Sequence, residues 1–230
     1  MSLKSLCLSA IAIGTLPLSV FAADLSAPAA GNAAEPAASS VHAWDGVYLG
    51  AFVEGLKGSD HWYGSVYDHG TEEFEGWLGG ARVGIGAQVA SALYVGASAD
   101  VAAVSAPYRH ELPAGSYDDV NPTYQATADI RAGFALDSVL LYGSVGVAAL
   151  AMDSEFFKPA DQTDAHNNIA YGWLAGAGFE VALTENVSIY GEYRTYQFNP
   201  VTRLSLWDPS IESNEIAYQS VKVGINYRLN

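Results

Sequence analysis

The sequence predicts an all-β protein: an eight-stranded, antiparallel, up-and-down transmembrane β-barrel with long extracellular loops and short periplasmic turns. Three observations predict this fold class. Apolar residues recur at every second position from Trp44 onward, as in strands that send alternate side chains to opposite faces. The segments with this period are near the ~9–11 residues that a tilted strand needs to cross a bilayer. The connections between them alternate between short and long, which is typical of bacterial outer-membrane barrels.

The composition agrees with a membrane protein that has no membrane helix. Hydrophobic residues make up 50% of the 230 residues and charged residues only 15%, against roughly 25% in soluble domains. No stretch beyond the leader reaches the ~18 unbroken apolar residues of a membrane helix. The net charge of −15 repels phosphate backbones, so nucleic acid is not expected as a partner.

The first 42 residues precede the period-two region. Residues 1–22 carry Lys4, an apolar core over 6–21 and small residues before a cleavage point after Ala22, which predicts a secretory signal peptide. An uncleaved anchor is the alternative, and Pro17 argues against it. Residues 23–42 predict a flexible Ala/Pro-rich periplasmic tether. The barrel is expected over 43–230, in the cell outer membrane.

Period two is clearest in "TYQATADIRAGFA", residues 123–135. One parity carries apolar residues such as Ala126 and Ile130, and the other carries Asp129 and Arg131. The same division recurs in eight segments, which in chain order are 46–54, 80–89, 93–102, 123–135, 139–150, 174–183, 187–196 and 221–229.

The connections fall into two classes. Short turns are expected at 90–92, 137–138 and 184–186, and long polar loops at 55–76, 105–122, 152–168 and 199–215. Both termini and the short turns then lie on the periplasmic side.

The polar parity is predicted to line the lumen. A soluble eight-stranded barrel of the lipocalin kind would instead expose this parity to water, but it has few charges and many glycines. Its charges balance and can pair across a narrow lumen, where the glycines are expected to make room for them. The other parity is free of charge, as lipid requires. The predicted lumenal charge network comprises Glu54, Arg82, Asp100, Asp129, Arg131, Glu180, Glu192, Arg194, Lys222 and Arg228.

Aromatic residues cluster near the ends of the predicted strands. Such residues form belts at membrane interfaces, although Tyr and Trp also favour strands in general. The predicted interfacial aromatics are Trp77, Tyr124, Tyr171, Trp173, Tyr218 and Tyr227.

Several motifs resemble one family. "WDGVYLGAF" (44–52) is similar to the W-x-G-x-Y-x-G opening of the small outer-membrane immunogenic proteins of alphaproteobacteria, which are OmpA-like barrels without a peptidoglycan-binding domain. "IRAGFALDSVLLYGSVGVAALAM" (130–152) and "VKVGINYRL" (221–229) resemble the family's central hairpin and closing strand. The resemblance implies an abundant, surface-exposed outer-membrane barrel, often described as porin-like. Members usually end in an aromatic residue that the barrel-assembly machinery reads, whereas this chain ends in Leu229-Asn230.

Two functions follow from a narrow barrel. The first is a structural and surface-interaction role, with paired charges filling the lumen; the alternative is a narrow porin-like channel for passive diffusion of ions or small solutes. The expected partners are outer-membrane lipid, lipopolysaccharide bound through divalent cations, the barrel-assembly machinery and an unidentified extracellular ligand.

An enzyme is not expected. Every histidine lies in the predicted tether or in a predicted loop, and no Ser/His/acid grouping is evident. The stretch from His61 to Gly70 holds two histidines and Asp68, but its spacing fits no fixed metal-ligand template. No cofactor, metal or catalytic residue is therefore predicted.

Overall fold

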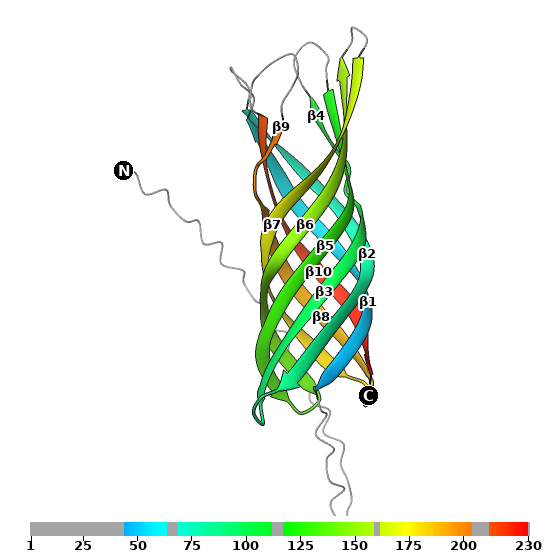
Figure 1. The fold of residues 1–230 in the computed structure, drawn as a ribbon, viewed down its shortest axis with the longest axis vertical. Helices are drawn as coiled ribbons and strands as arrows, with labels where there is room; N and C mark the ends of the chain where they lie inside the picture. The colour runs from blue at the N-terminus through cyan, green and yellow to red at the C-terminus, as the bar shows by residue number, and fades with distance from the viewer. Residues whose placement is uncertain (1–43, 64–68, 112–116, 159–161, 204–211, 230) are drawn as a thin grey trace, which may run out of the picture. The chain divides into compact units, whose positions relative to one another are not determined.

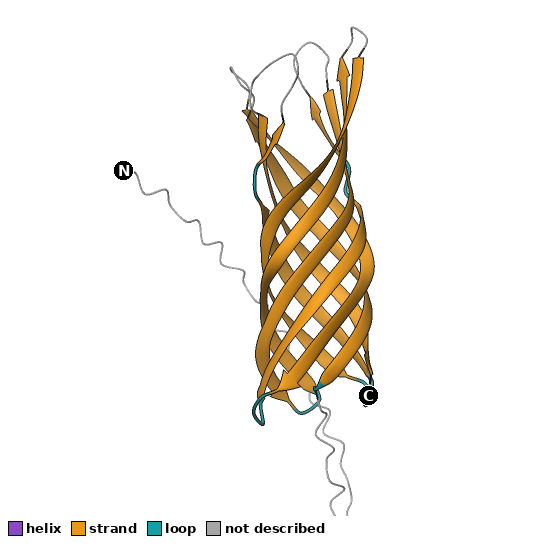
Figure 2. Ribbon diagram, in the orientation of Figure 1, coloured by secondary structure: helices purple, strands orange, loops and turns teal. Residues whose placement is uncertain are grey.

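The computed structural model describes residues 44–63, 69–111, 117–158, 162–203 and 212–229. The predicted signal peptide and tether lie outside the described residues. Every regular element that the model describes is a β-strand (Figure 2). Across these same ranges, no helix is present that is long and apolar enough to cross a membrane.

Eight long strands form a closed antiparallel barrel, which confirms the predicted fold class (Figure 1). Each strand pairs with its neighbours around the ring, and β10 pairs with β1 to close it. Closure gives the backbone groups of the wall partners within the sheet, the condition for crossing hydrocarbon. The strands are β1 (Gly46–Tyr63), β2 (His69–Gln88), β3 (Leu93–Ser105), β5 (Tyr117–Leu136), β6 (Val139–Lys158), β7 (Gln162–Ala182), β8 (Val187–Phe198) and β10 (Glu212–Leu229).

Three tight turns join strands at one end of the barrel, called here the turn end. They occupy residues 89–92, 137–138 and 183–186, close to the predicted positions. Asp137 has a φ of 55°. This left-handed conformation suits a two-residue hairpin and is open to Asp because its short polar side chain bonds locally. The C-terminus lies at the same end (Figure 1).

The stretches predicted as long loops are largely strand, so those loop boundaries are wrong. β1 continues to Tyr63 and β2 begins at His69, inside the stretch 55–76. Two short strands, β4 (Tyr108–Glu111) and β9 (Val201–Arg203), pair with β5 and β10 within two other stretches. The alternation of side chains reflects the contrast between lipid and lumen. The alternation of apolar and polar residues is weak in these stretches, but their backbone groups still pair. We call this end of the barrel the loop end.

The two parities of each strand have opposite environments. The apolar parity faces outward: Ile130 is 64% exposed and Val147 is 62% exposed. The other parity faces the lumen, where the side chain of Arg194 is fully buried. The direction predicted for both parities is therefore the one that the structure has.

Candidate functional site

The candidate site is the barrel lumen, where all ten residues of the predicted charge network are buried. They come from seven of the eight wall strands, and all of them occupy inward-facing positions. Eight of them form a connected group that we call the ionic layer: Glu54, Arg82, Asp100, Asp129, Arg131, Glu192, Arg194 and Lys222.

Arg82 holds two carboxylates at once. It faces Asp100 in the register of β2 and β3 and donates from Nε to Oδ1 (2.7 Å) and from Nη2 to Oδ2 (3.0 Å). The same Nη2 donates to Oε2 of Glu192 on β8 at 2.7 Å. This guanidinium therefore links a neighbouring pair of strands to a strand farther around the ring.

Arg194 is the second junction of the ionic layer. Its Nη2 donates to Asp129 Oδ2 and to Glu192 Oε1, both at 3.0 Å, and its Nη1 donates to Asp100 Oδ2 at 3.3 Å. Arg131 Nε donates to Asp129 at 3.1 Å, and its Nη2 lies 3.7 Å from Glu192. Charge-assisted, multidentate contacts of this kind are the strong class of hydrogen bond.

Lys222 completes the charge balance. Its ammonium lies 2.8 Å from Asp100 and 3.1 Å from Glu54. The layer thus contains four cations and four anions and carries no net formal charge. Buried charges cost several kcal/mol each unless they are paired, so the balance is what makes the arrangement tolerable inside the barrel.

Aromatic rings flank the cations. Arg82 lies 4.5 Å from the ring centroid of Tyr190, Arg131 lies 4.9 Å from that of Tyr142, and the Lys222 ammonium lies 4.2 Å from that of Phe52. Desolvated cation–π contacts are worth up to about 2 kcal/mol. These rings therefore stabilise the cations on the sides that no carboxylate covers.

Glu180 and Arg228 do not join the ionic layer, which corrects their predicted place in the network. Within the part of the chain that the structure describes, neither forms an ion pair with it. Glu180 accepts hydrogen bonds from the Ser188 hydroxyl and from Asn226 Nδ2. Arg228 donates to the Asp45 carbonyl at 3.0 Å and lies over the Trp44 ring. Both residues lie near the turn end of the barrel. The ionic layer lies farther along the lumen, so neither side chain reaches it.

Inward-facing glycines make room for the charges, as expected, and also for tyrosine rings: a Cβ on Gly178 would come within 2.7 Å of Glu192 Cγ, and one on Gly176 within 3.0 Å of Arg194 Cγ. A Cβ on Gly84 would overlap the Tyr48 ring, and one on Gly224 would come within 2.6 Å of Tyr190 Cζ. Gly86 lies in the same way against Tyr94, and Gly178 lies against Tyr142 as well as Glu192. The rings lean along the wall over these flat positions.

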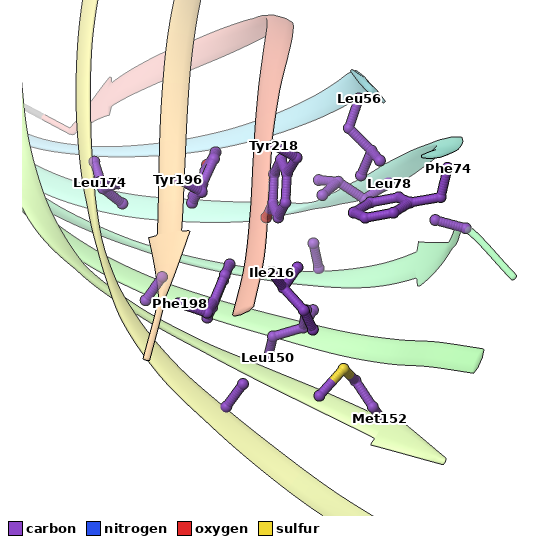
Figure 3. Close-up of a cluster of buried hydrophobic side chains, with 14 of the residues drawn as sticks. Leu56, Phe74, Leu78, Leu150, Met152, Leu174, Tyr196, Phe198, Ile216 and Tyr218 are labelled. Carbon is purple, nitrogen blue, oxygen red and sulfur yellow. The ribbon is translucent and has the colours of Figure 1, made fainter. Parts of the chain in front are cut away.

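An apolar layer fills the lumen on the loop side of the ionic layer (Figure 3). We call its central residues the loop-end plug: Phe74, Leu150, Tyr196, Phe198, Ile216 and Tyr218. The sequence reasoning missed it because it expected a polar lumen throughout. The signal is present in the inward parity of β6, which runs from Ser144 through Ala148 and Leu150 to Met152. A smaller apolar cluster, the turn-end cap, comprises Trp44, Tyr94, Ala135, Leu140 and Tyr142.

Five of the six predicted interfacial aromatics lie exposed on the outer face: Trp77, Tyr124, Tyr171, Trp173 and Tyr227. Their place at a membrane interface stays a prediction. For Tyr218 the prediction is wrong, because the residue is 3% exposed and donates to Gln125 in the lumen. Tyr218 lies four residues before Lys222 on β10, so both side chains point to the same face. Because a charged residue is expected in the lumen, this spacing marks Tyr218 as inward-facing.

Ligands for a metal are not gathered in the described residues, where no group of three or more His, Cys, Asp or Glu side chains is suitably placed. Of the stretch 61–70, residues 64–68 lie outside the description. His61 Nδ1 lies 2.7 Å from the Thr71 hydroxyl on the neighbouring strand, as in an ordinary cross-strand contact.

Comparison with known proteins agrees with this architecture. Residues 20–228 match the family model described as outer membrane protein beta-barrel domain. The chain is 26% identical over 244 residues to the 31 kDa outer-membrane immunogenic protein of Brucella melitensis, covering 98% of this chain and 100% of that protein. It is 25% identical over 229 residues to the 25 kDa outer-membrane immunogenic protein of Brucella canis, covering 99% of each.

The fold also resembles that of a solved outer-membrane barrel. The outer membrane protease OmpT from Escherichia coli aligns with a TM-score of 0.50 at 7% identity, over 80% of this chain and 97% of that one. At this identity the likeness concerns the architecture alone.

Proposed function

Because this chain belongs to the outer membrane protein β-barrel family, we propose that it is a structural and surface-interacting barrel of the outer membrane whose lumen does not conduct. The wall anchors the protein in the membrane, and the hairpins of the loop end present its surface to the outside. The role requires no catalysis, and the relatives that span the whole chain are outer-membrane immunogenic proteins.

The ionic layer is the observation that carries the proposal. Four cations and four anions meet across the lumen at 2.7 to 3.7 Å, and their side chains are at most 3% exposed. An eight-stranded barrel has an interior only wide enough for side chains. A solute on this path would have to break several buried ion pairs. Breaking each pair would leave uncompensated charges in the lumen, which is costly.

The alternative is a narrow channel, and one observation favours it. Several buried lumenal polar atoms have no hydrogen-bond partner among the residues that the structure describes, among them the hydroxyls of Tyr48, Tyr142 and Ser144. Buried polar atoms are usually satisfied by protein or by ordered water. A file of water along these hydroxyls would support the passage of small ions.

The decisive test is conductance of the natural protein. Outer-membrane fractionation and a heat-modifiability gel first establish that the barrel is inserted and folded. In planar bilayers we expect no current steps above those of the lipid alone. Reproducible current steps from the folded form, at a size proportional to salt concentration, would favour the channel instead.

We propose lipopolysaccharide as a membrane partner. A groove of about 670 Å³ on the outer face has a lining that includes Trp77, Tyr193 and Val221 together with Lys57 and Glu75, and its apolar part would accept an acyl chain. Exposed carboxylates lie in the groove at Glu75 and farther toward the loop end at Glu73, Asp153 and Glu155. Divalent cations between these carboxylates and lipid phosphates would join protein to lipid.

Chelation tests that partnership. Removing divalent cations from outer-membrane extracts should reduce the lipopolysaccharide that co-purifies with the barrel, and Mg²⁺ should restore it. Unchanged co-purification after chelation would contradict the cation bridge.

Export and assembly are part of the proposal. Cleavage after Ala22 predicts a mature chain that begins at Ala23, which the intact mass of the purified protein measures. Insertion is proposed to depend on the barrel-assembly machinery although the last residues are Leu229-Asn230. Depletion of that machinery should leave the heat-modifiable form reduced, and undiminished folding would contradict the dependence.

A further inference from the structure

The lumen changes from charged to aromatic within one step of the strand period. On β8, Glu192 and Arg194 are followed at the next inward positions by Tyr196 and Phe198. Inward positions of a strand are about 6.6 Å apart. The loop-end plug therefore lies directly on the ionic layer, and a solute on the lumenal path meets the two in succession.

The plug is closely packed. Tyr218 stacks on Tyr196 with ring centroids 4.4 Å apart and on Phe198 at 5.8 Å, and Phe74 meets Tyr218 edge-on at 6.3 Å. Leu150 and Ile216 belong to the same buried cluster, and each is at most 3% exposed. Figure 3 shows these side chains converging from different strands into the lumen.

The polar atoms of the plug are already engaged. The Tyr196 hydroxyl donates to Glu54 Oε1 at 3.2 Å, and the Tyr218 hydroxyl donates to Gln125 Oε1. Both hydroxyls therefore already have partners, and ring faces and aliphatic groups make up the rest of the loop-end plug. An ion there would lose its hydration shell without gaining ligands, which is the principle of a hydrophobic gate.

From this geometry we infer that the loop-end plug is an ion barrier in its own right, in series with the ionic layer. Either barrier closes the lumen when the other is removed. The inference rests on the proposed non-conducting function. It adds that residues outside the charge network also keep the lumen closed to ions. Removing ion pairs alone consequently leaves the barrel closed.

The test compares four variants by conductance in planar bilayers, each checked for folding by heat modifiability. The layer variant combines Arg82→Ala, Asp100→Ala, Glu192→Ala and Arg194→Ala, which keeps the charge balanced. The plug variant combines Phe198→Ser and Tyr218→Ser. The combined variant carries all six changes. The matched control carries Phe134→Ser and Tyr227→Ser, which make the same chemical changes on the outer face.

We expect current steps from the combined variant only. Current from the layer variant at the level of the combined variant would overturn the inference, because the intact plug would then be no barrier. If the combined variant folds but gives no current steps, the inference is also overturned. Current from the natural protein would instead contradict the proposed function, so the two failures are distinguishable.

A chemical measurement covers the case in which the layer variant does not fold. Ser220, 3% exposed, lies between Tyr218 and Lys222 on the inward parity of β10. In a Cys7→Ser background, a Ser220→Cys thiol is the only one in the chain. The plug changes should accelerate its reaction with a small, charged thiol reagent by roughly tenfold or more, equivalent to about 1.4 kcal/mol of protection. The same rate with and without the plug changes would overturn the inference.

Discussion

Arg82 on β2 donates a 2.7 Å hydrogen bond to Glu192 on β8, although these strands are not neighbours in the barrel wall. Contacts of this kind tie together parts of the wall that no backbone pairing joins. The stability of the barrel therefore depends on each buried charge keeping its partners.

Arg194→Ala should destabilise the barrel by about 3–5 kcal/mol, because it leaves buried carboxylates uncompensated. Asp129, Glu192 and Asp100 all lose a partner in this variant. Urea unfolding in detergent micelles, followed by gel mobility, measures the change.

The matched control is Arg109→Ala, which breaks the exposed pair with Asp119, where the arginine side chain is 52% exposed. Exposed pairs contribute about 1 kcal/mol or less. Equal losses for Arg194→Ala and Arg109→Ala would contradict a buried, interdependent ionic layer.

Gly84→Ala should cost about 1–3 kcal/mol, the usual cost of overpacking. The added methyl overlaps the Tyr48 ring. Gly55→Ala is the control, because a Cβ there has no atom within 4 Å. The same unfolding assay applies, and a neutral Gly84→Ala would argue that the Tyr48 ring does not occupy this position.

Ile130→Arg should cost about 2–4 kcal/mol in a bilayer, the range for a basic residue on the lipid face near the midplane. Ile130 is 64% exposed on the outer face of β5. Asn121→Arg, exposed on the same strand beyond Tyr124, should stay within about 0.5 kcal/mol. Unfolding from lipid vesicles measures both. A tolerated Ile130→Arg would contradict contact of this face with acyl chains.

Trp77 should be quenched by brominated lipids labelled near the headgroup more than by lipids labelled at the chain end, as the interfacial belt requires. The measurement uses a variant that retains Trp77 as its only tryptophan. A variant that retains only Trp44, which is fully buried, is the control and should show little quenching by either lipid. Strongest quenching of Trp77 from the chain end would place it in the hydrocarbon instead.

The alternation of side chains allowed the wall of the barrel to be predicted from sequence. Ile130 and Asp129 occupy opposite environments, and a period of two records that contrast at every position. The pairing of charged side chains within the lumen could not be predicted in this way. Whether Arg82 meets Glu192, or Glu180 meets none of the cations, depends on the tilt and stagger of the strands, which alternation does not encode.

The loop-end plug and the hairpin extensions were missed for a related reason. Leu150 and Ile216 are apolar at inward positions, where the lumen was expected to be polar. β1 continues to Tyr63 although its sequence beyond Leu56 shows no alternation of apolar and polar residues. Tyr218 was assigned from its residue type, and its parity would have placed it correctly.

The seam between β1 and β10 has a consequence for how the protein is made. It joins the first and last of the described strands, aligning Val47 with Leu229 and Tyr63 with Ser213. Until the final strand has been synthesised, both sheet edges are open templates for pairing with other chains. Contacts this distant in sequence also form slowly. The barrel can therefore close only after its last strand has been synthesised.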